Sequence, residues 1–183
     1  MIKKVAIALF TILVICCTNT DNFKIEKGRV GKLNIKTTIK DLPIIFKNDS
    51  IVKNLSEGAQ GDNYFQDDDE YLIYEKGGKH LLTITPKEPL DSTSIIKSIQ
   101  IHDPRYKTES DINLSASFAQ INSVQKPRVE STLSSVTLFL DNINATVTIE
   151  KEELGIKNIN TQKVTLEQIP DLAKIKSFIV WFN

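Results

Sequence analysis

The sequence predicts an α+β fold, made mainly of an antiparallel β-sheet with two or three short helices. Short segments alternate between apolar and polar residues, which is typical of strands with one buried face. The pair Gly77-Gly78 lies between two apolar runs, a pattern typical of a β-hairpin. Hydroxyl residues followed three positions later by Asp or Gln indicate helix starts. Together these features favour a sheet with short helices at its corners.

The predicted strands are short, and most of them pair in hairpins. The Gly-Gly turn separates one pair, and the sequence Asp-Asn-Ile-Asn at 141–144 separates another. The last strand is rich in β-branched and aromatic residues, so we expect the chain to end inside the sheet. In chain order, strands are expected at residues 33–36, 71–75, 80–85, 95–102, 136–140, 145–149 and 177–182.

Three capping boxes predict where the helices begin. They are Thr38-x-x-Asp41, Ser117-x-x-Gln120 and Thr165-x-x-Gln168, in which the hydroxyl accepts from a backbone N–H and the later side chain reaches back. Pro43 and Pro170 follow two of these caps, and each would delete a helical hydrogen bond. The helices are therefore expected to be short or bent.

Two segments of the chain share one pattern. Residues 33–47 align without gaps on residues 112–126, and five paired positions are apolar in both, although few residues are identical. Each segment reads as a strand, a tight turn and a short helix. Two explanations stay open: convergent local chemistry at strand-to-helix corners, which we favour, and a weak internal duplication.

The chain opens with an export signal. Lys3 and Lys4 precede an apolar run at 5–17, which fits the roughly 7–15 residues of a signal-peptide core and is too short for a stable membrane span of about 20. Residues 13–17 (LVICC) resemble a bacterial lipobox, which implies that Cys17 is the lipidated cysteine, with palmitate as the expected modification. We therefore expect a signal peptide at 1–16, a lipidated cysteine and tether at 17–27, and a single domain at 28–183. Because Asp21 is not at the second mature position, the outer membrane is favoured by analogy with enterobacterial sorting.

Composition narrows the classes of partner. The mature chain would carry 21 basic and 23 acidic side chains, a formal charge of −2, so it has no basic excess for nucleic acid. Both cysteines lie in the export signal, which excludes disulfides and zinc–thiolate sites after Cys17. Phosphate-binding glycine loops, Gly-x-Ser-x-Gly and His-Glu-x-x-His are absent from the sequence. We expect no cofactor and no bound metal.

The layout of the chain resembles a known group of proteins. The features that carry the resemblance are the lipobox, the motif Gly28-x-x-Gly31-Lys32-Leu33, the Tyr-rich hairpin, the segments 99–103 and 113–118, and the terminal segment 175–181. This layout resembles small uncharacterised bacterial envelope lipoproteins, including an enterobacterial group under sigma-E control. The resemblance implies an α+β lipoprotein domain and brings no catalytic motif with it.

Charged and titratable residues offer weak candidates for chemistry. The acidic run at 67–70 lacks the alternate spacing of a calcium loop, so we interpret it as a solvated loop. His80 and His102 are the two histidines of the chain. His102 and Asp103 are neighbours in or beside a strand, so their side chains should point to opposite faces rather than form a dyad.

The aromatic residues suggest where a partner could bind. Tyr71 and Tyr74 lie on the first hairpin and Trp181 lies on the last strand, and we take these three as the candidate contact surface. The sequence favours a non-enzymatic, lipid-anchored binding or support module, with the membrane and another envelope protein as partners. The alternative is a hydrolase or metal-dependent enzyme that combines acids at 62–70 with His80 or His102.

Overall fold

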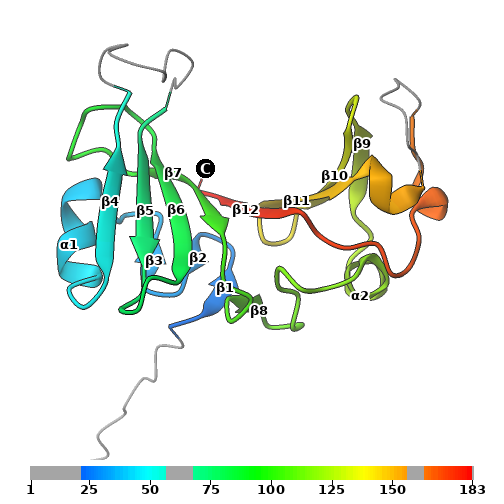
Figure 1. The fold of residues 1–183 in the computed structure, drawn as a ribbon, viewed down its shortest axis with the longest axis horizontal. Coiled ribbons are helices and arrows are strands. Elements are labelled where there is room, and N and C mark those ends of the chain that lie inside the picture. Colours follow the sequence, from blue (N-terminus) through cyan, green and yellow to red (C-terminus); the bar gives the residue numbers. More distant parts are fainter. Residues whose placement is uncertain (1–21, 57–67, 156–162, 183) are drawn as a thin grey trace, which may run out of the picture.

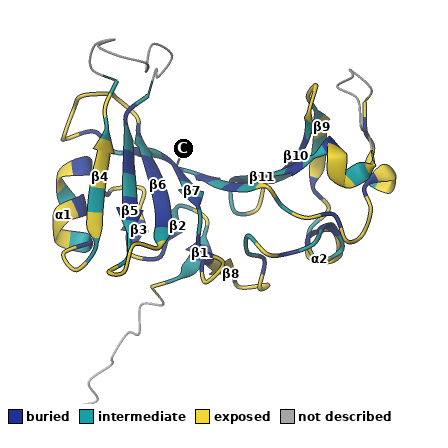
Figure 2. Ribbon diagram, in the orientation of Figure 1, coloured by how far each residue is buried: buried dark blue, intermediate teal, exposed yellow. Residues whose placement is uncertain are grey.

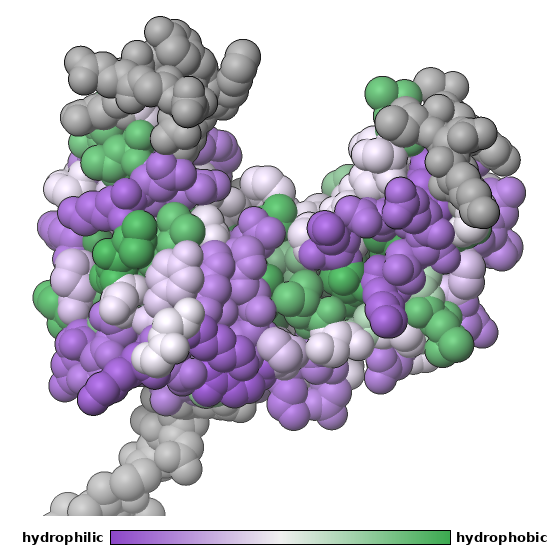
Figure 3. Space-filling view, viewed as in Figure 1, coloured by the Kyte–Doolittle hydropathy of each residue, from purple (hydrophilic) through white to green (hydrophobic). Residues whose placement is uncertain are grey.

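The computed structural model describes residues 22–56, 68–155 and 163–182. Most of these residues form one eight-stranded antiparallel sheet, with the strand order β4-β5-β6-β7-β12-β11-β10-β9. A smaller four-stranded sheet, β3-β2-β1-β8, lies beside it. The molecule is U-shaped in Figure 1, with the first half on the left, the second half on the right and β12 running between them. Figure 3 shows a hollow between the two halves.

The elements are short, as the sequence predicts. The strands are β1 (Lys24–Glu26), β2 (Arg29–Val30), β3 (Leu33–Asn34), β4 (Ser50–Asn54), β5 (Glu70–Tyr74), β6 (His80–Pro86), β7 (Ile96–Ile101), β8 (Lys107–Thr108), β9 (Arg128–Ser131), β10 (Ser135–Leu140), β11 (Ala145–Glu150) and β12 (Ser177–Trp181). The helices are α1 (Leu42–Ile45) and α2 (Phe118–Val124), with 3-10 turns η1 (Ile39–Asp41), η2 (Lys151–Leu154) and η3 (Leu166–Gln168).

A single apolar core lies on one face of the large sheet and extends across both halves. Alternate residues are buried in β5, β10, β11 and β12 (Figure 2), and one row of ladder partners on the core side crosses all eight strands. In strand order this row is Ile51, Ile73, Leu82, Ile101, Phe178, Val147, Leu138 and Val129. Leu42 of α1 and Phe118 and Ile121 of α2 pack onto the same core.

The predicted α+β class, both predicted hairpins and the final strand are confirmed. The predicted strand at 33–36 is shorter than expected, because the side chain of Asn34 accepts a hydrogen bond from the Lys36 N–H at 2.9 Å and turns the chain. The folded part also starts before residue 28. Ile25 of β1 is 1% exposed and pairs with Val30, so residues 24–26 belong to the small sheet rather than to a tether.

The two segments with a shared sequence pattern make equivalent backbone contacts at their capped turns. The Ile39 N–H donates to Ser94 O and the Lys40 N–H donates to Ser92 O. In the second half, 79 residues later in every case, the Phe118 N–H donates to Ala173 O and the Ala119 N–H donates to Asp171 O. The isolated bridges Thr38↔Ile95 and Ser117↔Lys174 keep the same spacing. Each half is therefore a capped turn and short helix followed by four antiparallel strands.

The halves are related by a pseudo-twofold axis through the centre of the large sheet. In the β7–β12 ladder Ile99 pairs with Val180 and Ile101 pairs with Phe178, and Gln100 pairs with Ile179 between them. Because the equivalent positions of the halves differ by 79 residues, each pair maps onto the other. The axis therefore passes between Gln100 and Ile179, and the repeated architecture favours an internal duplication over convergent corners.

Gly31 is required by a close approach of the chain to itself. It has a φ of +55°, and a Cβ atom built there would lie 2.3 Å from the backbone oxygen of Asn22. Both observations exclude a side chain at this position without movement of the backbone.

The capping box of α2 makes a measurable contribution. The Ser117 hydroxyl accepts from the Gln120 N–H, and the Gln120 side chain accepts from the Ser117 N–H at 2.8 Å. We expect Ser117→Ala to lower the free energy of unfolding by about 1 kcal/mol in urea titrations. Ser123→Ala, on the exposed face of the same helix, is the matched control and should change it by less than about 0.5 kcal/mol. Equal effects of the two variants would contradict the capping role.

Candidate functional site

The candidate site is the open face of the large sheet, opposite the core. Its strand side chains are mostly half-buried, and many are Thr, Ser or Gln rather than aliphatic residues. At its centre lie Gln100 and Ile179, on the pseudo-twofold axis. A sheet face of this kind, polar and partly accessible, is the surface that an antiparallel sheet can leave to solvent or to a partner.

A pocket of about 260 Å³ opens on this face in the second half, which we name the tryptophan pocket. The Trp181 indole N–H donates to the Thr146 hydroxyl at 3.1 Å, and the Asn144 amide donates to the backbone oxygen of Trp181 at 2.9 Å. The first bond holds the indole ring, and the second holds the backbone that carries it. The pocket is lined by Arg128, Phe139, Asp141, Asn144, Ala145, Thr146 and Trp181.

A polar pair forms the other wall of the tryptophan pocket. Arg128 makes two hydrogen bonds of 3.0 Å with the Asp141 carboxylate, and its guanidinium lies over the ring of Phe139, 4.6 Å from the centroid. The Arg128 and Asp141 side chains are 60% and 65% exposed, so both can exchange their mutual bonds for a ligand. The aromatic rings can contact apolar groups of a partner, and the guanidinium and carboxylate beside them can form paired hydrogen bonds with its polar groups.

The first half presents a stack of three rings on the open face, which we name the histidine stack. Tyr74 stacks on His80 with 4.6 Å between ring centroids, and His80 stacks on His102 at 3.8 Å. The stack forms because β6 and β7 pair, and the His102 N–H donates to the backbone oxygen of Leu81. The Thr83 hydroxyl contacts the Nε2 atoms of both histidines, at 3.2 Å for His80 and 3.0 Å for His102.

The hydrogen bonds of the histidine stack define its protonation. His80 Nε2 lies 3.1 Å from Leu82 O, and since a carbonyl oxygen can only accept, this Nε2 carries a hydrogen. The Thr83 hydroxyl is then free to donate to His102 Nε2 when that atom carries no hydrogen. Burial and the neighbouring His80 lower the pKa of His102 to about 4, and burial also lowers the pKa of His80. Both rings are neutral at pH 7.

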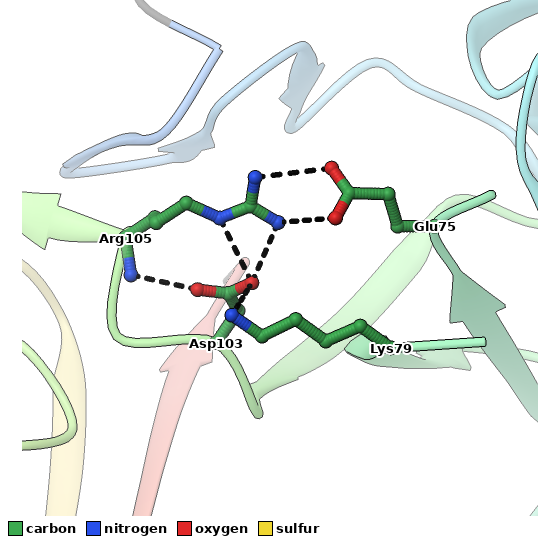
Figure 4. A network of polar contacts seen from close by, with 4 residues as sticks. All are labelled: Glu75, Lys79, Asp103 and Arg105. Carbon is green, nitrogen blue, oxygen red and sulfur yellow. Dashed lines mark hydrogen bonds and ion pairs between the residues drawn. The ribbon is translucent and has the colours of Figure 1, made fainter. Parts of the chain in front are cut away.

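The sequence predicts that Asp103 and His102 do not form a dyad, and Asp103 instead binds other residues. Its carboxylate is 0% exposed and accepts from the Arg105 guanidinium at 2.7 Å and from Lys79 at 2.9 Å (Figure 4). Arg105 continues to Glu75 through two further bonds, so the network ties the β5–β6 turn to the segment after β7. Burial opposes ionisation of Asp103, but the hydrogen bonds from Arg105 and Lys79 outweigh it and lower its pKa to about 2. This network is structural rather than part of the open face.

The acidic run is not the solvated loop that the sequence suggests, at least at Asp69. Asp69 is 0% exposed, and its carboxylate accepts from the Ser56 N–H and hydroxyl and from the Leu90 N–H at 2.7–2.9 Å. These hydrogen bonds lower its pKa despite burial, so it is an ionised tie between two loops. Asp68 pairs with Lys97 at 2.9 Å, and residues 62–67 lie outside the described residues. The sequence carried no signal for the burial of one acid in a run of four.

The three predicted contact residues are placed on different faces. Tyr74 and Trp181 lie on the open face, in the histidine stack and the tryptophan pocket respectively. Tyr71 lies on the core side and is 7% exposed. The open-face residues that sequence reasoning missed are Arg128, Phe139, Asn144 and Thr146, which alternation and the 145–149 strand could have placed beside Trp181.

Within residues 22–56, 68–155 and 163–182, no group of three or more His, Cys, Asp or Glu side chains could hold a metal ion. In the same ranges, no helix has the length and apolar character needed to cross a bilayer. Cys17 and the apolar run before it lie outside the described residues.

Comparison with known proteins shows similarity at the level of the fold. No protein-family model and no curated protein matches the sequence. Among solved structures, the chain is similar to the crystal structure of the uncharacterized protein yfeY from Escherichia coli, with a TM-score of 0.52 and 12% sequence identity. The similarity covers 86% of this chain and 99% of that chain. The two proteins therefore share a fold over nearly the full length of yfeY.

Proposed function

We propose that the protein is a lipid-anchored, non-enzymatic binding module of a bacterial cell envelope, attached through Cys17 and favouring the outer membrane. The observation that carries the proposal is the open face of the large sheet with the tryptophan pocket in it. Support for the anchor comes from the export signal and lipobox alone. The similarity to yfeY and the resemblance to envelope lipoproteins are consistent with this assignment and rest on fold and layout.

We propose another envelope component as the partner of the open face. Half-buried Trp and Phe rings flanked by Arg, Asp and Asn resemble the composition of contact centres in protein interfaces, where aromatic residues and Arg dominate the binding energy. One hydrogen bond holds the Trp181 ring and another holds its backbone before any partner arrives, so little conformational entropy is lost on binding.

The alternative hydrolase draws on one specific contact. The Thr83 hydroxyl lies 3.0 Å from His102 Nε2, which is the arrangement of a nucleophile and its base. However, Thr83 is 7% exposed, and a histidine with a pKa of about 4 is a weak base at neutral pH. We therefore rank binding above hydrolysis.

Site-directed crosslinking in cells tests the binding proposal. With a photo-crosslinking amino acid at Ile179, on the axis of the open face, we expect one recurrent envelope component to be captured and identified by mass spectrometry. Trp181→Ala and Arg128→Ala should each reduce this capture by about tenfold, because each removes part of the contact centre. Cys17→Ala should abolish it by releasing the protein from the membrane.

Two controls decide the interpretation. Lys107→Ala removes an exposed ion pair with Asp111. Lys107 lies in β8 of the small sheet and does not line the tryptophan pocket, so this variant should leave capture unchanged. A crosslinker at Lys76, in the exposed β5–β6 turn, measures capture by proximity to the membrane alone. Equal capture from Lys76 and Ile179, or capture that survives Trp181→Ala and Arg128→Ala, would contradict the proposal.

A further inference from the structure

A second pocket, of about 280 Å³, lies between the helical corner of the first half and edge strand β4. We name it the edge groove. Its floor is apolar: Ile39, Leu42 and Tyr71 are each no more than 7% exposed, and Ile51 is partly buried against the same core. It lies on the core side of the sheet, so it is separate from the tryptophan pocket on the open face.

The charged side chains that line the edge groove are both lysines. Lys40 projects from η1 and Lys53 from β4, and both are exposed. In the described part of the chain, neither makes an ion pair with a carboxylate. An apolar floor with two lysines at its rim is complementary to an apolar group that carries a nearby negative charge.

The second half shows what covers the equivalent position. There the chain between β11 and β12 brings Val164 and Ile169 into the core, where they are 5% and 4% exposed. The Val164 N–H donates to the Ser131 hydroxyl of edge strand β9 at 2.8 Å. A few residues later, Asp171 O accepts from the Ala119 N–H at the start of α2. We name residues 164–171 the covering segment, and it joins edge strand β9 to the start of α2.

The first half includes no covering segment in the residues that the structure describes, 22–56 and 68–101. Its β6–β7 connection is short and reaches the helical corner, where Ser92 O accepts from the Lys40 N–H, without a counterpart of Val164 bound to β4. Leu90, which is equivalent to Ile169 by the 79-residue spacing, is 53% exposed. The edge groove lies between Ser92 and β4, at the position that the covering segment fills in the second half. Ala119 replaces Lys40 there, so the rim charge is particular to the first half.

We propose that the edge groove binds a short segment of a partner polypeptide that imitates the covering segment of the second half. The segment inserts a branched apolar side chain (Val, Ile or Leu) over Leu42 and Tyr71 and places an Asp or Glu carboxylate beside Lys40 and Lys53. β4 is an edge strand of the large sheet, so a chain that lies along residues 50–53 extends the sheet. This site is additional to the open face and does not depend on a ligand there.

A random peptide library displayed on phage, selected against the purified full chain, tests the proposal. We expect enriched peptides to share a Val, Ile or Leu within a few positions of an acidic residue. Binding of a synthetic enriched peptide should weaken by at least about tenfold in Lys40→Glu/Lys53→Glu, and should weaken in 0.5 M salt because the lysines are exposed. Ser92→Phe, which fills the mouth of the groove from an exposed position, should also weaken it.

Matched controls separate the groove from general charge and from the open face. Lys76→Glu/Lys87→Glu makes the same change of net charge at exposed lysines outside the groove and should leave peptide binding unchanged. Trp181→Ala should also leave it unchanged, so failure of the open-face proposal would not affect this result. Enrichment without the shared motif, or binding that is indifferent to both groove variants, would overturn the proposal. Lysine-dependent binding of decanoate without peptide enrichment would overturn it in favour of a lipid site.

Discussion

Replacing His102 with glutamine is expected to abolish most of the loss of stability that the wild-type protein shows between pH 6.5 and pH 4. The pKa of His102 is about 4 in the folded protein, against 6.5 for an unperturbed histidine. Between these values the unfolded chain binds a proton that the folded protein does not, so stability falls as the pH falls. The full difference corresponds to about 3 kcal/mol at 1.36 kcal/mol per pKa unit.

The physical origin of this effect is the histidine stack. A proton on His102 would place a charge in a half-buried ring 3.8 Å from His80, and it would also occupy the Nε2 atom that accepts from Thr83. Glu70, the acidic group that acts on His80, raises the pKa of His80 but does not overcome burial. Glutamine at 102 can still accept from Thr83 and does not titrate, so His102→Gln should lose most of the dependence of its stability on pH between 6.5 and 4 and keep most of its stability at pH 7.

Urea titrations at pH 7.0, 5.5 and 4.5, followed by the fluorescence of Trp181, the one tryptophan of the chain, measure the effect. Thr83→Val is the matched control. It removes the shared hydroxyl without removing a titrating group, and we expect it to lower stability by about 1 kcal/mol at every pH. Parallel curves for wild type and His102→Gln over this range would rule out the depressed pKa as the cause.

Features that depend on neighbouring residues in the chain could be predicted from the sequence. The β5–β6 and β10–β11 hairpins follow from alternation around Gly77-Gly78 and 141–144, because turn chemistry is local. The capping boxes at Thr38, Ser117 and Thr165 are present, since each requires two side chains three positions apart. Short strands such as β2 and β8 carry no pattern that distinguishes them from loops.

Features that depend on which face of a strand is buried could not be predicted. Leu72 and Ile73 are both apolar, so alternation does not show whether Tyr71 or Tyr74 points to the core. The histidine stack requires the β6–β7 register, which places His80 and His102 side by side across strands. The internal duplication leaves a weak signal in the sequence for a similar reason. The two halves share backbone hydrogen bonds, and these can form without identical side chains.

Replacing Asp103 with asparagine is expected to lower the free energy of unfolding at pH 7 by about 3 kcal/mol. The Asp103 carboxylate is fully buried and accepts four hydrogen bonds, from Lys79 and from the Arg105 N–H, Nε and Nη2. Asparagine has nearly the same shape, but its amide nitrogen would face donors and leave them without an acceptor. Hydrogen bonds to a charged group contribute about 1.5–3 kcal/mol, and loss of one partner of a buried ion pair costs about 3–5 kcal/mol. Arg105 and Lys79 can regain water, which places the loss at the lower end.

The same carboxyl determines a second acid transition, below that of His102. Its pKa of about 2 is below the usual 3.8, so its contribution is present above pH 4 and is lost as the pH falls toward 2. Wild type should therefore lose about 2 kcal/mol over this range that Asp103→Asn does not lose. Glu75→Gln removes the exposed partner of the same Arg105 and should cost less than about 1 kcal/mol, because ion pairs at the surface are weak. If Glu75→Gln and Asp103→Asn destabilise the protein equally, the stabilising centre of the network is Arg105 and not the buried carboxylate.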